Sequence, residues 1–257
     1  MKLILCIAFA LTACGSNGDS GGAGGAGGAD GGGTGQSDGG TGSNQSPECG
    51  TLRGVIRDFK IAHPDFEVVP PNDVVIKGLV NPTITPGGRP TLSANAPAAG
   101  LITSADTFNQ WYTNVDGINL PFVHDFVLNE TPVDSGQYVY DDGAYFPIDN
   151  LGFGNEGNPH NYHFTTEIHA TFSYAGGEKF TFRGDDDVWV FVNGKLAIDI
   201  GGVHSANEAT IDFDARAAEL GITPQHDYAI DFFQAERHVT ESNFRIETSI
   251  ACFVILF

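Results

Sequence analysis

Basic residues are scarce in this sequence. The 257 residues include 12 Lys and Arg against 32 Asp and Glu, which gives a formal net charge of -20. A surface this acidic repels nucleic acid and anionic lipid headgroups, and no basic cluster offsets it. We therefore exclude nucleic acid as a partner and expect the protein to attract cations.

Long apolar runs are also lacking. The longest, Leu3 to Leu11, is too short to cross a bilayer as a helix, which needs about 20 residues. It follows Lys2 and ends in Thr12-Ala13-Cys14, a small-residue ending typical of an export signal. Leu11 to Cys14 resembles a bacterial lipobox, which implies a signal peptide over 1–13 and lipidation of Cys14. Ordinary secretion is the alternative.

The lipobox resemblance also implies a location. Gly15 follows the cysteine, which resembles the pattern of lipoproteins sorted to the outer membrane. We expect an exported protein, anchored by lipid at the cell surface of a Gram-negative bacterium. Its only contact with the membrane would then be the lipid anchor, because two or more acyl chains anchor stably without a spanning helix.

Cysteine is rare. Cys6 leaves with the signal and Cys14 would be lipidated, so Cys49 and Cys252 remain for the exported protein. In an oxidising compartment we expect these two to form a disulfide, and two free thiols are the alternative.

The composition divides the mature chain into two parts. Residues 14–47 are rich in Gly and small polar residues, with little to bury, and we expect a flexible tether. Residues 48–257 have the length of a single all-β domain.

Helical patterns are few and strand patterns frequent. Phe164 to Tyr174 alternates as a strand with one wet face, and further strands are expected at 228–233 and 244–252. A helix is expected from Ser104 to Tyr112, with core aromatics, and another at 214–220, capped by Asp214 and ended by Gly221. These elements predict an antiparallel two-sheet β-sandwich with one or two short helices.

One stretch stands out. Asp185, Asp186 and Asp187 precede an apolar strand, 188–192, that turns through Asn193-Gly194 into 195–200. Asn-Gly between apolar alternations predicts a type I′ hairpin, in which we expect Phe191 to face Leu196 and Trp189 to face Ile198. The three carboxylates then lie at the mouth of the hairpin.

Such a cluster suits calcium, a hard cation that takes six to eight oxygen ligands. Neighbouring residues of a regular strand point to opposite faces, so two adjacent Asp side chains can share an ion only if the backbone departs from that geometry, as in a cis peptide. From spacing alone, a metal site and a solvated acidic loop are equally supported.

Four segments resemble the fibro-slime domain and together span nearly the whole domain in order. They are GVIRDFKIAHPDFE at 54–67, PHNYHFTTEIHATFSYAGG at 159–177, FTFRGDDDVWVFVNGKLAIDIGGVH at 180–204 and AERHVTESNFRIET at 235–248. That family is similar to the anthrax protective-antigen type of domain, known as PA14, a β-sandwich found in glycosidases, toxins and adhesins. The resemblance implies a calcium ion held by a cis-linked Asp pair, with sugar hydroxyls bound to the calcium.

By this resemblance the pair falls on Asp185 and Asp186. Relatives complete the site from a loop between late strands, here 235–243, where Asn243 is the first candidate and Glu236 the next. Asp187 is an additional candidate metal ligand. His204 and His238 flank the same rim and are candidate ligand contacts, with structural hydrogen bonding as the alternative.

The resulting hypothesis is a non-catalytic surface module for calcium-dependent glycan recognition, adhesion or extracellular slime. A structural or protein-interaction domain, in which the Asp cluster only rigidifies a loop, is the main alternative. A zinc enzyme is a third, because His160, His163, Glu167 and His169 are close in sequence. No HExxH helix supports it, and nothing resembling a G-x-S-x-G elbow surrounds Ser205 or Ser242.

Overall fold

The computed structural model describes residues 48–69, 72–96 and 101–256. The expected signal peptide, Cys14 and the tether lie outside these residues. Within them, no helix is both long and apolar enough to span a membrane.

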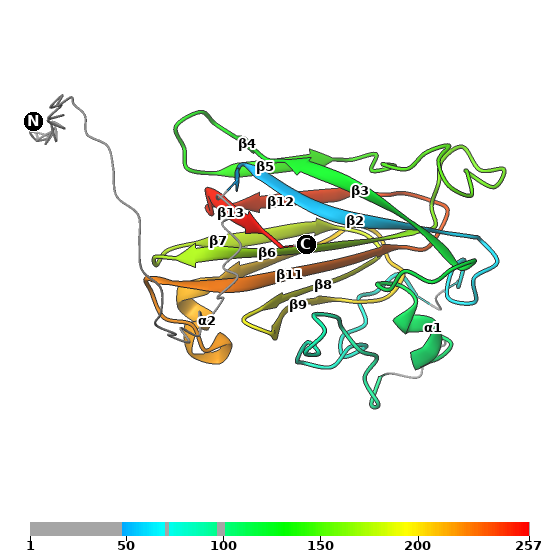
Figure 1. Ribbon diagram of the computed structural model, residues 1–257, viewed down its shortest axis with the longest axis horizontal. Coiled ribbons are helices and arrows are strands. Elements are labelled where there is room, and N and C mark those ends of the chain that lie inside the picture. The colour runs from blue at the N-terminus through cyan, green and yellow to red at the C-terminus, as the bar shows by residue number, and fades with distance from the viewer. Residues whose placement is uncertain (1–47, 70–71, 97–100, 257) are drawn as a thin grey trace, which may run out of the picture. The chain divides into compact units, whose positions relative to one another are not determined.

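Two antiparallel sheets form the domain (Figure 1), as the sequence predicts. The eight-stranded sheet contains β1 (Glu48–Cys49), β2 (Thr51–Phe59), β3 (Asn119–Val127), β6 (Phe164–Tyr174), β8 (Asp187–Val192), β9 (Lys195–Ile200), β11 (His226–Glu236) and β13 (Cys252–Ile255). The five-stranded sheet contains β4 (Asn129–Glu130), β5 (Tyr138–Asp142), β7 (Lys179–Gly184), β10 (Asn207–Asp212) and β12 (Phe244–Thr248). In the larger sheet the order β1-β13-β6-β11-β8-β9 is extended by β2, which pairs with both β6 and β3.

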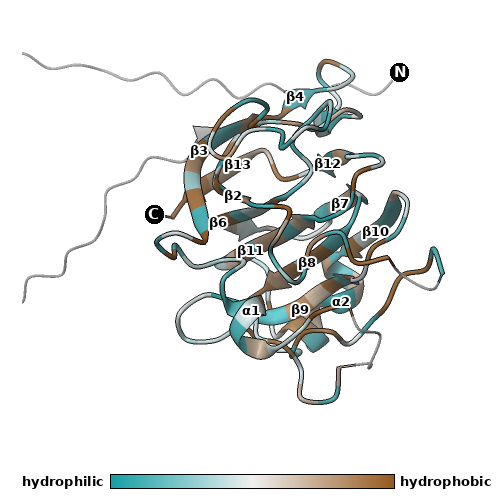
Figure 2. Ribbon diagram, turned by 90° about the vertical axis from the view of Figure 1, so that its right-hand side faces the viewer, coloured by the Kyte–Doolittle hydropathy of each residue, from teal (hydrophilic) through white to brown (hydrophobic). Residues whose placement is uncertain are grey.

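The main core joins the inner faces of the two sheets. Phe232 of β11 meets Phe182 of β7 and Phe244 of β12 at centroid distances of 5.0 and 5.4 Å. Such aromatic pairs contribute beyond their buried area. Every residue of β8 is buried, and Figure 2 draws this strand mostly in brown, whereas β10 is largely teal.

A second core covers the outer face of the larger sheet. Helix α1 (Ala105–Asn109) begins after Ser104, whose hydroxyl accepts from the Thr107 amide at 3.1 Å. The helix is shorter than predicted. The expected aromatic packing is nevertheless confirmed, because Phe108, Trp111 and Tyr112 are at most 2% exposed and pack with Trp189 of β8.

The hairpin of β8 and β9 is largely as predicted. Both turn residues have positive φ, 50° at Asn193 and 74° at Gly194, as a type I′ turn requires. Phe191 faces Leu196, but Trp189 does not face Ile198, because an irregularity between Val190 and Phe191 shifts the register. Trp189 faces Asp199 instead and donates its indole N–H to that carboxylate at 3.1 Å.

The start of the second helix differs from expectation. Helix α2 (Phe213–Leu220) is capped by Asp212 rather than Asp214, whose carboxylate accepts from the Tyr174 hydroxyl at 2.7 Å. The C-terminal stop at Gly221, with φ 70°, is as predicted. Figure 1 shows α1 and α2 near opposite ends of β8 and β9.

The expected strand 244–252 is two strands, and the first half pairs in the smaller sheet while the second pairs in the larger one. β12 ends at Thr248 and β13 begins at Cys252. The predicted disulfide is confirmed, since Cys49 and Cys252 are directly paired residues of β1 and β13 joined at an S–S distance of 1.98 Å. It ties the start of the described domain to its last strand.

Candidate functional site

The chain passes between the two sheets at the Asp cluster. β7 ends at Gly184 in the smaller sheet and β8 begins at Asp187 in the larger one, so Asp185 and Asp186 form the crossing. The peptide bond between these two residues is cis. A second crossing, residues 237–243, leads from β11 to β12 beside the first.

Asp185 links the two crossings directly. Its carboxylate oxygens accept from the Asn243 backbone amide at 2.5 Å and from the Asn243 side-chain amide at 2.8 Å. The crossings approach closely because residue 184 is glycine, where a Cβ would lie 2.3 Å from the Asn243 carbonyl oxygen. The structure therefore brings together Asp185 and Asn243, two residues distant in sequence that were expected in one site.

Asp186 lies deeper, at 4% exposure. Its carboxylate accepts from the backbone amides of His204 at 3.2 Å and Arg237 at 3.1 Å. Burial raises the pKa of Asp186 well above its usual value, and although the Arg237 charge opposes this shift, the Asp187 charge adds to it.

Asp187 points into the protein. One carboxylate oxygen accepts from the Gly202 amide at 2.5 Å, and the other pairs with Arg237 at 2.7 Å in a salt bridge with both side chains fully buried. Arg237 also donates to the carbonyl oxygens of Asp65 and Leu101, at 2.9 and 2.7 Å.

The guanidinium of Arg237 lies 4.9 Å from the centroid of the Trp111 ring. The sequence analysis missed this arginine. The sequence signal available for it was a single basic residue next to Glu236, at the end of a strand in an acidic domain.

Glu236 ends β11 and is 0% exposed. Among the described residues, neither of its carboxylate oxygens has a hydrogen-bond partner. Burial raises the pKa of Glu236 well above its usual value, and the charges of Asp186 and Asp185 raise it further. The nearby Ser242 hydroxyl and His238 amide oppose that shift only in part.

Burial also raises the pKa of Asp185, against the two hydrogen bonds from Asn243. Burial thus raises the pKa of three carboxylates at one rim, those of Asp185, Asp186 and Glu236. The only cation at this rim among the described residues, Arg237, pairs with Asp187. The rim is short of positive charge.

A surface depression of about 540 Å³ opens over the pair. It is lined by Asp185 and Asp186 together with both candidate histidines, His204 and His238. His204 Nδ1 lies 2.9 Å from the Ser205 carbonyl oxygen and donates to it, because a carbonyl oxygen can only accept. Its buried Nε2 lacks a partner in the described chain.

Asn243 lies on a neighbouring depression of about 460 Å³ that shares Thr240 and Glu241 with the first. Of the expected site residues, the structure therefore gathers Asp185, Asp186, Asn243 and Glu236 at one rim. Asp187 adjoins them but is directed to Arg237. No group of three or more His, Cys, Asp or Glu side chains with metal-binding geometry occurs in the described residues.

The four residues of the zinc alternative do not share one set of partners. His160 pairs with Asp149 at 2.6 Å and His163 with Glu67 at 2.8 Å. Glu167 and His169 do share one strand face, as expected, with 2.9 Å between the carboxylate and Nε2.

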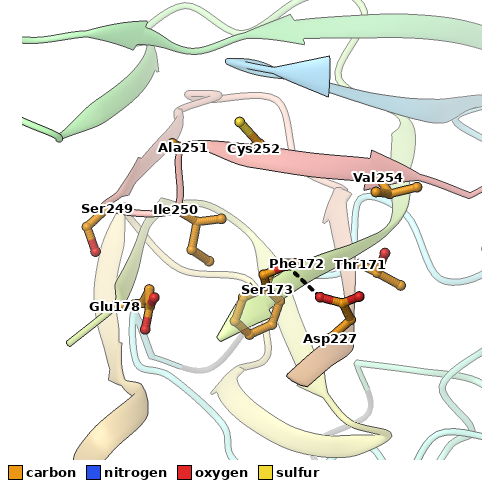
Figure 3. Close-up of a pocket in the computed structure, with 10 residues that line it drawn as sticks. All are labelled: Thr171, Phe172, Ser173, Glu178, Asp227, Ser249, Ile250, Ala251, Cys252 and Val254. Carbon is orange, nitrogen blue, oxygen red and sulfur yellow. Dashed lines mark hydrogen bonds between the residues drawn. The ribbon is translucent and has the colours of Figure 1, made fainter. Parts of the chain in front are cut away.

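A further depression, of about 490 Å³, is lined mainly by the paired strands β6 and β13 and by residues 249–251 (Figure 3). Its two acidic residues are held by the chain itself. Asp227 accepts from the Ser173 hydroxyl at 2.5 Å, and Glu178 accepts from the amides of Ala175 and Gly176, both at 2.8 Å. This depression offers little for a ligand beyond contact area.

The chain is similar to three Dictyostelium discoideum proteins, psiQ, psiC and psiD. Identity is 40% over 199 residues, 38% over 201 and 37% over 221, covering 72%, 73% and 81% of this chain. The matched regions are 20%, 38% and 43% of those proteins, so this chain spans well under half of each.

Among solved structures, an anti-sigma factor domain-containing protein is 19% identical with a TM-score of 0.32, covering 46% of this chain and 39% of that one. The PA14 domain of the antifreeze protein MpAFP is 13% identical with a TM-score of 0.27, covering 44% and 66%. These scores are too low to support an argument.

A family model described as the PA14 domain matches residues 141–250. The matched stretch contains both sheet crossings, with Asp185, Asp186 and Asn243. Residues 141–250 of this chain are therefore similar to the PA14 domain family.

Proposed function

We propose that this protein is a non-catalytic surface module that recognises glycans through a calcium ion bound at Asp185 and Asp186. The observation that supports it best is the placement of two adjacent, buried carboxylates on the wall of a 540 Å³ depression, linked to Asn243. PA14 domains are modules of the carbohydrate-binding and adhesion type, which agrees with this proposal.

The residues present suit a hard cation. Asp185, Asp186 and the side-chain oxygen of Asn243 supply oxygen ligands of the type that calcium prefers. The raised pKa values of the Asp pair and of Glu236 mark a rim with uncompensated negative charge. A bound divalent cation would offset that charge and would offer open coordination positions to vicinal hydroxyls.

The other candidates have different roles in this proposal. Asp187 orients the crossing, because both of its oxygens are used by Gly202 and Arg237. His204 and His238 line the depression, where their ring nitrogens could form hydrogen bonds with sugar hydroxyls. The buried Glu236 adds negative charge close to Asp185 and Asp186.

A structural domain without ligand is the second candidate. Asp185 and Asp186 together accept four hydrogen bonds from His204, Arg237 and Asn243, which already holds the two crossings in place. In that case the Asp cluster only rigidifies the rim of a protein-interaction surface.

A glycan array run in calcium and in chelator separates these candidates. We expect calcium-dependent binding to some glycans, lost in an Asp185→Asn, Asp186→Asn double variant and kept in a matched Asp116→Asn, Asp134→Asn control, whose two carboxylates are exposed. Glycan binding that persists in chelator, or in the double variant, would contradict the calcium mechanism. Absence of any binding would favour the structural domain.

We also propose that the protein is exported and anchored through lipid on Cys14. The lipobox resemblance supports this, and the acidic domain would then face the exterior. Metabolic labelling with a radioactive fatty acid should mark the wild type and not a Cys14→Ser variant; equal labelling of both would exclude this anchor.

A further inference from the structure

A fourth depression, of about 520 Å³, lies on the opposite face of the eight-stranded sheet from the main core. Along β2, β6 and β11 its lining residues alternate with core residues, as Glu167 does with Ile168. The loop 86–89 forms one wall. None of its lining residues lines the depression over the Asp pair.

This depression, which we call the groove, is rich in cations although the protein is acidic. Its lining includes Arg53, Arg57, Arg89 and His169, whereas the whole chain has only 12 Lys and Arg. Arg53 is paired with Asp125. The other three surround a single carboxylate, that of Glu167.

The distances from Glu167 are 2.5 Å to Arg57 Nη1, 2.9 Å to His169 Nε2 and 3.5 Å to Arg89 Nε. His169 Nδ1 lies 2.6 Å from Asp231. Burial lowers the pKa of His169, but the hydrogen bonds to Asp231 and Glu167 outweigh burial and raise it to about 9. His169 is therefore charged at neutral pH, which leaves three cations against two carboxylates.

The surplus charge is accessible on Arg89. Its side chain is 45% exposed, and Nε donates to the Tyr112 carbonyl oxygen at 2.5 Å. The loop that carries it is closed by hydrogen bonds between Thr85 and Arg89, at 3.0 Å between amide and carbonyl. The terminal Nη groups of a guanidinium held in this way can bind a carboxylate through two parallel hydrogen bonds.

The remaining lining leaves room for more than a carboxylate. Gly54, Gly87 and Gly88 carry no side chain, and Val55 and Pro86 add apolar surface. The volume lies within the range of small-molecule sites, roughly 300 to 1,000 Å³.

We propose that this groove binds a carboxylate-bearing sugar ring, such as a hexuronic acid, with its carboxylate on Arg89 and its ring over Gly87, Gly88 and Val55. An acidic polysaccharide would supply such rings outside the cell. The site does not depend on calcium and is separate from the Asp pair.

The test is calorimetric titration of the full-length protein with sodium glucuronate, alongside glucose as the neutral counterpart and acetate as the carboxylate alone. We expect glucuronate to bind, glucose not to bind, and acetate to bind more weakly. Arg89→Gln should weaken glucuronate binding about 10-fold or more, because a hydrogen bond to a charged group is lost. Arg183→Gln removes the same charge from an exposed position on β7 and should leave binding unchanged.

Two further measurements test whether the variant is folded and whether the groove acts independently of the Asp pair. Circular dichroism must show the Arg89→Gln variant folded. The Asp185→Asn, Asp186→Asn variant should bind glucuronate as the wild type does, even if it has lost calcium. Equal binding of glucose, an equal loss in Arg183→Gln, or preference for an acidic peptide over glucuronate would overturn the proposal.

Discussion

The rim and the groove bury the same type of residue with opposite results. At the rim, Glu236 is 0% exposed and its pKa is raised, first by burial and then by Asp186 and Asp185. In the groove, Glu167 is 5% exposed and burial also acts to raise its pKa, but His169 and Arg57 outweigh burial and lower it. Burial alone therefore does not decide the charge of a carboxylate here.

The number of cations that face a buried carboxylate decides its charge. At the described rim, the arginine that meets the Asp cluster, Arg237, is paired with Asp187, whereas Arg57, Arg89 and His169 share Glu167. The rim is thus suited to receive a cation and the groove an anion. The following changes test that contrast, beginning with the largest expected effect.

Replacing Arg237 with Met should destabilise the rim most. Asp187 would remain buried and charged without its partner, which typically costs about 3 to 5 kcal/mol. Urea unfolding should show this loss in Arg237→Met, and the double variant Arg237→Met, Asp187→Leu should recover much of it. A loss below about 1 kcal/mol in the single variant would contradict a central role for the pair.

In the groove, His169 predicts a loss of stability in alkali. A folded-state pKa raised from 6.5 to about 9 gives stabilisation that is complete below pH 6.5 and is lost as pH rises through 9. The loss should be on the order of 3 kcal/mol at most, since one pKa unit corresponds to about 1.4 kcal/mol. Unfolding curves from pH 6 to 10 measure it, and His169→Gln should lack this dependence.

At the rim, Glu236 predicts a loss of stability with rising pH as well, but one that begins at a lower pH than for His169. Its folded state binds the proton more tightly, so its contribution to stability falls as pH rises above 4.5 towards the folded-state value. In chelator at pH 8, Glu236→Gln should therefore be about 1 to 3 kcal/mol more stable than the wild type, because a buried charge close to Asp185 and Asp186 is removed. The exposed Glu208→Gln serves as control, and a less stable Glu236→Gln would show that the charge is compensated.

Local patterns predicted much of the fold. The bounds of β6, the type I′ turn at Asn193-Gly194 and the stop at Gly221 depend on neighbouring residues alone, and each matches. The pairing of Trp189 and the division of 244–252 depend on a bulge and on which sheet each half joins, and no local rule supplies these.

The candidate site also has a part that the sequence predicted and a part that it did not. The resemblance to a known domain located Asp185, Asp186 and Asn243, which the structure places together. The Arg237 pairing and the groove around Glu167 bring together residues from distant strands and loops, so spacing along the chain gave no signal for them.

Calcium titration by calorimetry tests the central claim most directly. It compares the wild type, the Asp185→Asn, Asp186→Asn variant and the Asp116→Asn, Asp134→Asn control, each checked for folding by circular dichroism. We predict one calcium site in the wild type and the control, and none in the Asp185→Asn, Asp186→Asn variant. Equal calcium binding by all three, or no binding by the wild type, would contradict a cation site at the sheet crossing.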